Sequence, residues 1–101
     1  MQKIPKAVEI IGHKYSVVIS TEMSEDELGR CDYNNQKILI SKHQARDTMR
    51  DTFLHEIIHA VHWIMGLGDN STEEEFTART TTGLRSVMLQ NPEVVNYLFM
   101  R

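Results

Sequence analysis

The spacing of apolar and polar positions changes once along this chain, near residue 41. Before that point, β-branched runs alternate with short polar breaks, a pattern that predicts strands. The predicted strand segments are 7–11, 15–19, 29–33 and 36–41. Gly12-His13-Lys14 and Asn34-Asn35 separate them as expected hairpin turns. The acidic stretch 21–30, with Ser24 and Glu27 as a weak capping box, predicts a loop or a single helical turn.

From residue 42 onward the apolar spacing is that of helices. A first helix is predicted over 42–66, ended by Gly66-Leu67-Gly68. A second is predicted over 72–90, ended by Asn91-Pro92, and a short third one over 92–101, which is expected to pack Val94, Val95, Leu98 and Phe99. Strands followed by helices predict a single α+β domain over 1–101, with residues 1–41 mainly strands. We expect a small antiparallel sheet of two N-terminal hairpins, with the helices on one of its faces.

Histidines form a stripe of their own on the helix predicted over 42–66. At about 100° per residue, its apolar residues fall on one broad arc. These are Met49, Phe53, Leu54, Ile57, Ile58, Ala60, Val61, Ile64 and Met65. His55, His59 and His62 share a separate narrow line, with Glu56 at its edge. Lysine and glutamate usually occupy a solvated helix face, so three aligned histidines favour metal binding over a plain surface.

The stretch His55-Glu56-Ile57-Ile58-His59 has the H-E-x-x-H pattern. On a helix, residues four apart lie one turn above each other, so both imidazoles can reach one zinc ion. The glutamate between them stands where it can act as general base toward a water at that ion. We therefore predict His55 and His59 as zinc ligands and Glu56 as the catalytic residue.

A catalytic zinc needs a third protein ligand and an open position. His62 is poorly placed, because a straight helix can hardly wrap three turns around one ion, and it is a better candidate for lining the cleft, together with Tyr33. The remaining candidates are Glu73-Glu74-Glu75, which begin the next predicted helix, where each also completes a possible capping box. From its offset to the apolar face we rank Glu75 first and Glu74 as the alternative. Glu73 points into that face.

Composition narrows the class of protein. The chain of 101 residues is 41% hydrophobic and 25% charged, as in ordinary globular domains, with a net charge of −3. Without a Lys/Arg cluster, we expect no nucleic-acid partner. With no long apolar run and no signal-peptide pattern at the N-terminus, we expect no membrane association. A lone cysteine, Cys31, fits a reducing compartment, so the expected location is cytoplasmic.

Several segments together resemble a known group of proteins. They are Gly12-His13-x-Tyr15, the 29–40 hairpin, Asp51 to Ala60, Glu74-Glu75-Phe76, and 83–92. The chain resembles the gluzincin arrangement, and more closely the small phage and prophage zincin-like proteins related to the ImmA/IrrE and SprT-like metallopeptidases. The resemblance implies a minimal zincin core, in which strands precede an active-site helix and a second helix supplies the third ligand of one Zn²⁺ per chain.

The expected function is zinc-dependent hydrolysis of a peptide or protein substrate in a bacterial or phage-infected cell. The strand 37–40, directly before the helix, is expected to offer its edge to an extended substrate. Two alternatives stay open: a non-catalytic, zinc-stabilised protein-binding module, and a metal-free interaction protein whose histidine stripe is incidental. The sequence leaves the substrate and the oligomeric state undetermined.

Overall fold

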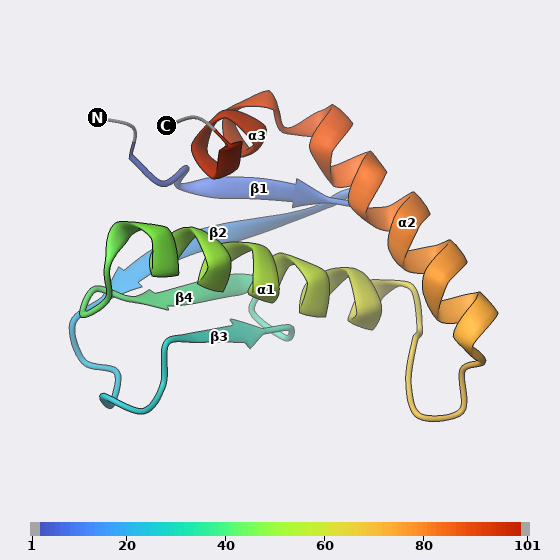
Figure 1. Ribbon diagram of the computed structural model, residues 1–101, viewed down its shortest axis with the longest axis horizontal. Helices are drawn as coiled ribbons and strands as arrows, with labels where there is room; N and C mark the ends of the chain where they lie inside the picture. Colours follow the sequence, from blue (N-terminus) through green and yellow to red (C-terminus); the bar gives the residue numbers. More distant parts are fainter. Residues whose placement is uncertain (1–2, 100–101) are drawn as a thin grey trace.

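A four-stranded sheet and three helices make up the fold in the computed structural model, which describes residues 3–99 (Figure 1). The strands are β1 (Ala7–Ile10), β2 (His13–Ser20), β3 (Gly29–Asp32) and β4 (Lys37–Ser41). The helices are α1 (Arg46–Ile64), α2 (Glu73–Gln90) and α3 (Pro92–Phe99). The expected α+β class is confirmed.

The sheet is mixed, whereas the sequence predicted an antiparallel one. Its order is β1-β2-β4-β3, and both expected hairpins, β1-β2 and β3-β4, are antiparallel. The hairpins join through a parallel pairing of β2 with β4, from Ser16↔Lys37 to Ser20↔Ser41. The 21–28 loop leads the chain from β2 to β3 at the far edge of the sheet, and β4 then pairs between β2 and β3. This arrangement places Ile38 and Ile40 in the middle of the sheet, where both are fully buried.

Both hairpin turns differ from the prediction. The first turn is Ile11–Gly12, with φ of 50° and 80°, as in a two-residue type I′ turn, and β2 already begins at His13. In the second connection the left-handed residue is Gln36, with φ of 52°, and neither asparagine of Asn34-Asn35. The Asp32 carboxylate accepts hydrogen bonds from the backbone and the side-chain amide of Asn35. A side-chain bond within the loop therefore sets the turn.

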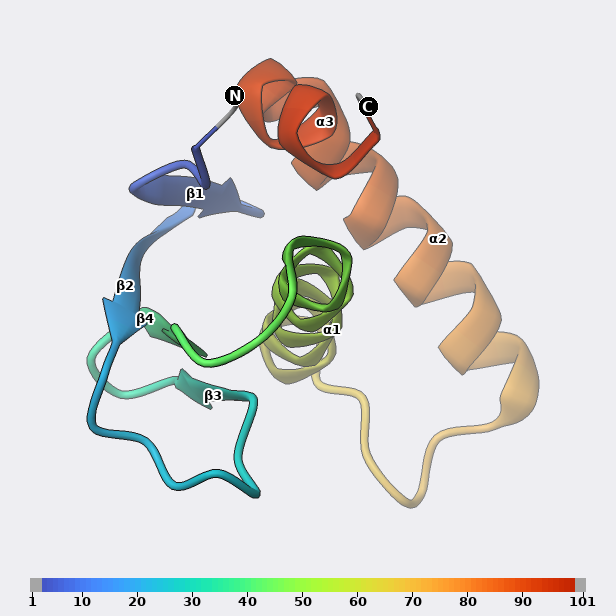
Figure 2. The ribbon, with the colours of Figure 1, turned by 60° about the vertical axis from the view of Figure 1, so that its left-hand side comes forward.

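Helix α1 lies at the centre of the molecule, with the sheet on one side and α2 and α3 on the other (Figure 2). Its expected apolar arc is buried at Phe53, Ile57, Ala60 and Val61. It begins at Arg46, later than the predicted residue 42. The reason is local: the 42–45 connection after β4 is held by a side chain, because Gln44 donates to the carbonyls of Ser41 and Leu28.

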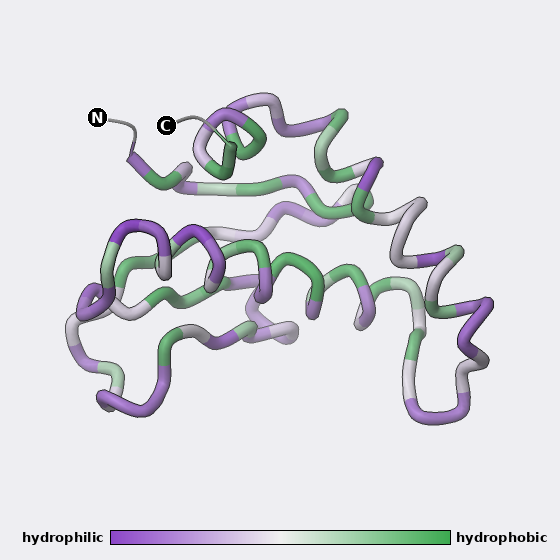
Figure 3. Tube along the Cα trace, in the orientation of Figure 1, coloured by the Kyte–Doolittle hydropathy of each residue, from purple (hydrophilic) through white to green (hydrophobic). Residues whose placement is uncertain are grey.

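Helix α2 begins after Thr72, whose hydroxyl accepts a hydrogen bond from the backbone N–H of Glu75. It crosses α1 at Gly83, where a Cβ would lie 2.5 Å from Cγ1 of Val61. The hydropathy colouring shows α2 as more polar than α1, in keeping with its outer position (Figure 3). Only Gly83 and Val87 of α2 are buried.

Helix α3 packs partly as the sequence predicts. Of Val94, Val95, Leu98 and Phe99, which were expected to pack inward, Val94 is buried and Leu98 lies against the core, but Phe99 is 60% exposed. Tyr97, which was not predicted, is the second buried residue of α3. The end of the predicted helix, 100–101, lies outside the described residues. Among residues 3–99, no helix combines the length and apolar character needed to cross a membrane.

Candidate metal centre

His55 and His59 lie one turn apart on the exposed side of α1, and their rings converge. The two Nε2 atoms are 3.0 Å apart, and the ring centroids are 4.6 Å apart at an interplanar angle of 73°. Two imidazole nitrogens on one tetrahedral zinc, each at 2.0–2.1 Å, would be about 3.3 Å apart. A few tenths of an ångström separate that value from the distance found. The pair therefore fits two ligand positions of a single zinc ion.

Glu56 points to the other flank of this pair and is buried, with 6% of its surface exposed. Its carboxylate faces β3, where a Cβ on Gly29 would lie 3.1 Å from Oε2. Burial raises the pKa of the Glu56 carboxyl above its usual value; His59 and His55 act in the opposite direction, and Glu27 adds to the rise. The sequence placed Glu56 at the edge of the histidine stripe, but it did not predict this burial.

Gly29 allows β3 to lie close to α1 at this point. A side chain there would meet Cγ2 of Thr52 at 2.6 Å as well as the Glu56 carboxylate. Thr52 is itself buried, and its hydroxyl donates to Oε1 of Gln44. Sequence reasoning missed this contact, because a glycine that opens a predicted hairpin strand is not distinguishable from an ordinary strand boundary.

A cavity of about 430 Å³ opens beside His55 and Glu56. It lies between α1 and the segment that leads into β3. Its remaining lining residues are Asp26, Glu27, Leu28, Gly29, Thr48, Asp51 and Thr52. The two side chains that carry the predicted chemistry therefore both line this cavity.

His62 is held by α2 and does not join the other two histidines. Its Nε2 lies 2.9 Å from Oγ1 of Thr80, and its ring meets Phe76 edge-on at 4.9 Å. Burial, followed by the nearby His59, lowers the pKa of His62 below its usual value. His62 therefore contributes to the contact between α1 and α2, consistent with the view that it is not a zinc ligand.

The third ligand is the part of the site that the structure does not bring together. Within residues 3–99, no group of three or more His, Cys, Asp or Glu side chains is arranged to hold a metal ion. Glu73, Glu74 and Glu75 are all exposed on the first turn of α2. The backbone N–H of Glu75 is bound by the Thr72 cap. The choice of Glu75, with Glu74 as the alternative, stays a prediction.

Tyr33, the second cleft candidate, stacks on Trp63 with centroids 4.6 Å apart and an angle of 11° between the planes. Burial raises the pKa of the Tyr33 hydroxyl, and Cys31 and Glu56 add to the rise. Tyr33 thus stands within electrostatic reach of Glu56 but is occupied by an aromatic contact.

The expected substrate edge on strand 37–40 is wrong. β4 has β2 on one side and β3 on the other, so its backbone groups are already paired. The outer strand beside α1 is β3, and it is the one that borders the cavity.

The chain belongs to the SprT-like family, whose model matches residues 7–90. The match covers all four strands, α1 and α2. It confirms the SprT-like part of the expected resemblance, and with it a zincin-type domain. The phage or prophage setting and the likeness to ImmA/IrrE stay predictions. No curated protein and no solved structure matches the chain.

Cys31 should be unreactive in the folded protein. Burial raises the pKa of its thiol to about 12, and the charges of Glu56 and Asp32 add to the rise. Only the thiolate reacts rapidly with alkylating reagents, so we expect slow modification by iodoacetamide at pH 7.5, against rapid modification in denaturant. The folded state favours the neutral thiol. The contribution of this preference to the free energy of unfolding is complete below pH 9 and is lost as the pH rises toward 12. Rapid labelling of folded protein at neutral pH would contradict this.

Proposed function

We propose that this protein is a zinc-dependent peptidase in which His55 and His59 are zinc ligands and Glu56 is the general base. The carrying observation is the arrangement of these three side chains: two Nε2 atoms 3.0 Å apart, with a buried carboxylate between the helix and the edge strand. Membership of the SprT-like family, a zincin-like family, supports it.

Zinc bound there would supply a Lewis acid that activates a water molecule and polarises a substrate carbonyl. The side chains of the protein do the remaining work. Glu56 accepts the proton of the attacking water and passes it to the leaving amine nitrogen. Its burial beneath β3 restricts the carboxylate, since the backbone of Gly29 lies against it.

The edge strand β3 suits an extended peptide substrate. One side of β3 pairs with β4, and its other side borders the cavity next to His55 and Glu56. A peptide that added there as a further strand would run past these two side chains, with its backbone held by main-chain hydrogen bonds. This mode of binding depends mainly on the substrate backbone and places few demands on the sequence of the substrate.

A zinc-stabilised binding module without catalysis is the second candidate. The observation in its favour is that no third ligand joins the histidine pair within the described part of the chain. The buried Glu56 speaks for catalysis, because a structural zinc site has no use for a buried carboxylate beside its ligands. Metal content and the Glu56→Gln variant together separate the two.

We expect protein purified without added metal to carry about one zinc per chain, as catalytic sites of this type do. Elemental analysis by mass spectrometry measures it. His55→Ala and His59→Ala should each reduce the zinc content to near zero, while His43→Ala, which changes an exposed histidine distant in sequence, should leave it unchanged. Chelation should lower the melting temperature by several degrees, since a ligand at a thousandfold excess over its Kd stabilises by about 4 kcal/mol. Full zinc content in both histidine variants would overturn the metal assignment.

The third ligand is tested by three matched substitutions on α2. Glu75→Gln should weaken zinc binding, with Glu73→Gln as the control that stays near wild type. Loss of zinc in Glu74→Gln instead would move the ligand by one residue and keep the proposal. If all three variants hold zinc and His62→Ala releases it, the assignment of the third ligand to α2 is wrong.

A further inference from the structure

A second cavity, of about 770 Å³, lies away from His55 and Glu56. Arg46 and Met49 of α1 line it, whereas Thr48, Asp51 and His55 line the first cavity. The two cavities have no lining residue in common. The second cavity is therefore separate from the proposed active site.

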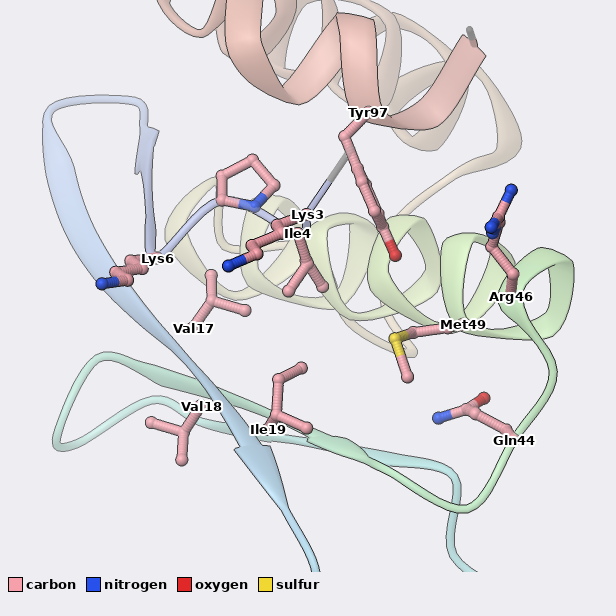
Figure 4. Close-up of a pocket in the computed structure, with 11 residues that line it drawn as sticks. Lys3, Ile4, Lys6, Val17, Val18, Ile19, Gln44, Arg46, Met49 and Tyr97 are labelled. Atoms are coloured by element: carbon pink, nitrogen blue, oxygen red, sulfur yellow. The ribbon is translucent and has the colours of Figure 1, made fainter. Parts of the chain in front are cut away.

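The walls of this cavity are apolar, with cations at two ends. Ile4, Val17, Ile19 and Met49 project into it, Lys3 and Lys6 stand on one side, and Arg46 stands on the other (Figure 4). None of the lining residues is acidic, although the chain carries a net charge of −3. Among residues 3–99, neither lysine nor Arg46 takes part in an ion pair. The cavity thus combines apolar surface with positive charges that lack a counterion within that range.

The backbone of β2 is uncovered along this cavity. Its pairing with β1 spans His13 to Ser16, and one further bond runs from the N–H of Val17 to the carbonyl of Lys6. In the described part of the chain, no strand continues beside residues 18–20 on that side. An uncovered strand edge of this kind is a template for an added strand.

Tyr97 brings a polar group into the apolar wall. The residue is 3% exposed, and its hydroxyl points into the cavity (Figure 4). Arg50 fixes the residue, since its Nε donates to the Tyr97 carbonyl at 2.8 Å and its guanidinium lies 5.5 Å from the ring centre. Within residues 3–99 the hydroxyl itself makes no hydrogen bond. It is thus available to a bound molecule.

We propose that this cavity binds an extended segment of a partner protein with an apolar centre flanked by acidic residues. The segment adds as a strand at residues 18–20 of β2, in line with β1. Its apolar side chains fill the space between Ile19 and Tyr97. Its acidic residues meet Lys3 and Lys6 at one end and Arg46 at the other.

Two other occupants fit the surface less well. A second copy of this chain, docked by a two-fold axis through the same face, would place the cationic ends that carry Lys3, Lys6 and Arg46 against cationic ends of the other copy. A fatty acid would match the apolar wall but has one charge for two cationic ends, and it has no backbone groups for the strand edge.

The test uses a fluorescein-labelled peptide, Asp-Glu-Val-Leu-Val-Glu-Asp, and fluorescence anisotropy on the full chain. We expect saturable binding that weakens as salt is raised, because the charged ends are solvent-accessible. Lys6→Glu with Arg46→Glu should weaken it at least tenfold. Lys37→Glu with Arg85→Glu, exposed charges away from this cavity, is the matched control and should bind as wild type. Circular dichroism confirms that both variants are folded.

Two altered peptides test the mode of binding. Replacing all four acidic residues by lysine should abolish binding, and methylating the backbone nitrogens of the two valines should weaken it strongly, because strand addition needs the N–H groups. Binding should persist after chelation and in Glu56→Gln, which separates this site from the proposed peptidase. Equal binding of the lysine peptide, or displacement by dodecanoate with no effect of N-methylation, would overturn the proposal. A concentration-dependent dimer that blocks the peptide would identify a second copy as the occupant.

Discussion

Glu56→Gln should reduce peptide hydrolysis by about a hundredfold or more while the protein keeps its zinc. General-base catalysis contributes roughly 10²–10⁴ to the rate, and the amide of glutamine cannot accept the proton of the attacking water. The substitution preserves the shape of a side chain that lies against Gly29, so packing should be retained. Hydrolysis of an unstructured protein such as casein, with elemental analysis of the same sample, measures both effects.

The matched control for this variant is Glu93→Gln, which removes a carboxylate from the exposed first turn of α3. It should retain wild-type activity and zinc. Two outcomes would contradict the assignment of Glu56. Loss of zinc in Glu56→Gln would make the carboxylate a ligand, and unchanged hydrolysis would show that another group takes the proton.

Asn91→Ala should cause the largest loss of stability among the single substitutions considered. Asn91 is 2% exposed, at the corner between α2 and α3. Its Oδ1 accepts from the N–H of Glu9 at 2.8 Å, and its Nδ2 donates to the carbonyls of Glu9 and Val87, each at 2.7 Å. Alanine would leave these three buried backbone groups without hydrogen-bond partners. Each unsatisfied buried group lowers the free energy of unfolding by about 1–3 kcal/mol.

A total loss of about 3 kcal/mol would lower the melting temperature by roughly 12–24 °C, given 4–8 °C per kcal/mol for a domain of this size. Thermal unfolding followed by circular dichroism measures it. Asn96→Ala changes an exposed asparagine on α3 and should shift the melting point little. A shift in Asn91→Ala no larger than that of Asn96→Ala would mean that β1 is not held to the helices through this side chain.

The features that the sequence predicted well depend on neighbours within a few residues. The hairpin strands follow from alternating apolar residues, and the buried arc of α1 follows from the helical spacing of Phe53, Ile57 and Val61. The convergence of His55 and His59 is also a local feature, because a helix places residues four apart on one line. The family resemblance was visible for the same reason, since the H-E-x-x-H pattern at 55–59 is contiguous.

The errors and omissions concern contacts between distant segments. The free edge on strand 37–40 was wrong because β4 pairs in parallel with β2, a choice made by the 21–28 loop and by the burial of Ile38 and Ile40. In α3 the sequence prediction included Phe99, but Tyr97 joins Val94 in the core instead, beside Phe53. The parallel pairing of β2 with β4 leaves no local signal in the sequence.

By itself, the sequence determined the α+β class, the two hairpins and the helix that carries the histidine pair, because short-range periodicity and turn chemistry decide these. Tertiary structure alone decided that Glu56 is buried against Gly29, that His62 is bound to Thr80, and that β3 borders the cavity. These contacts join residues 18 to 27 positions apart or depend on the order of the strands. Their formation rests on the balance of burial and loop closure over the whole chain, which no local pattern encodes.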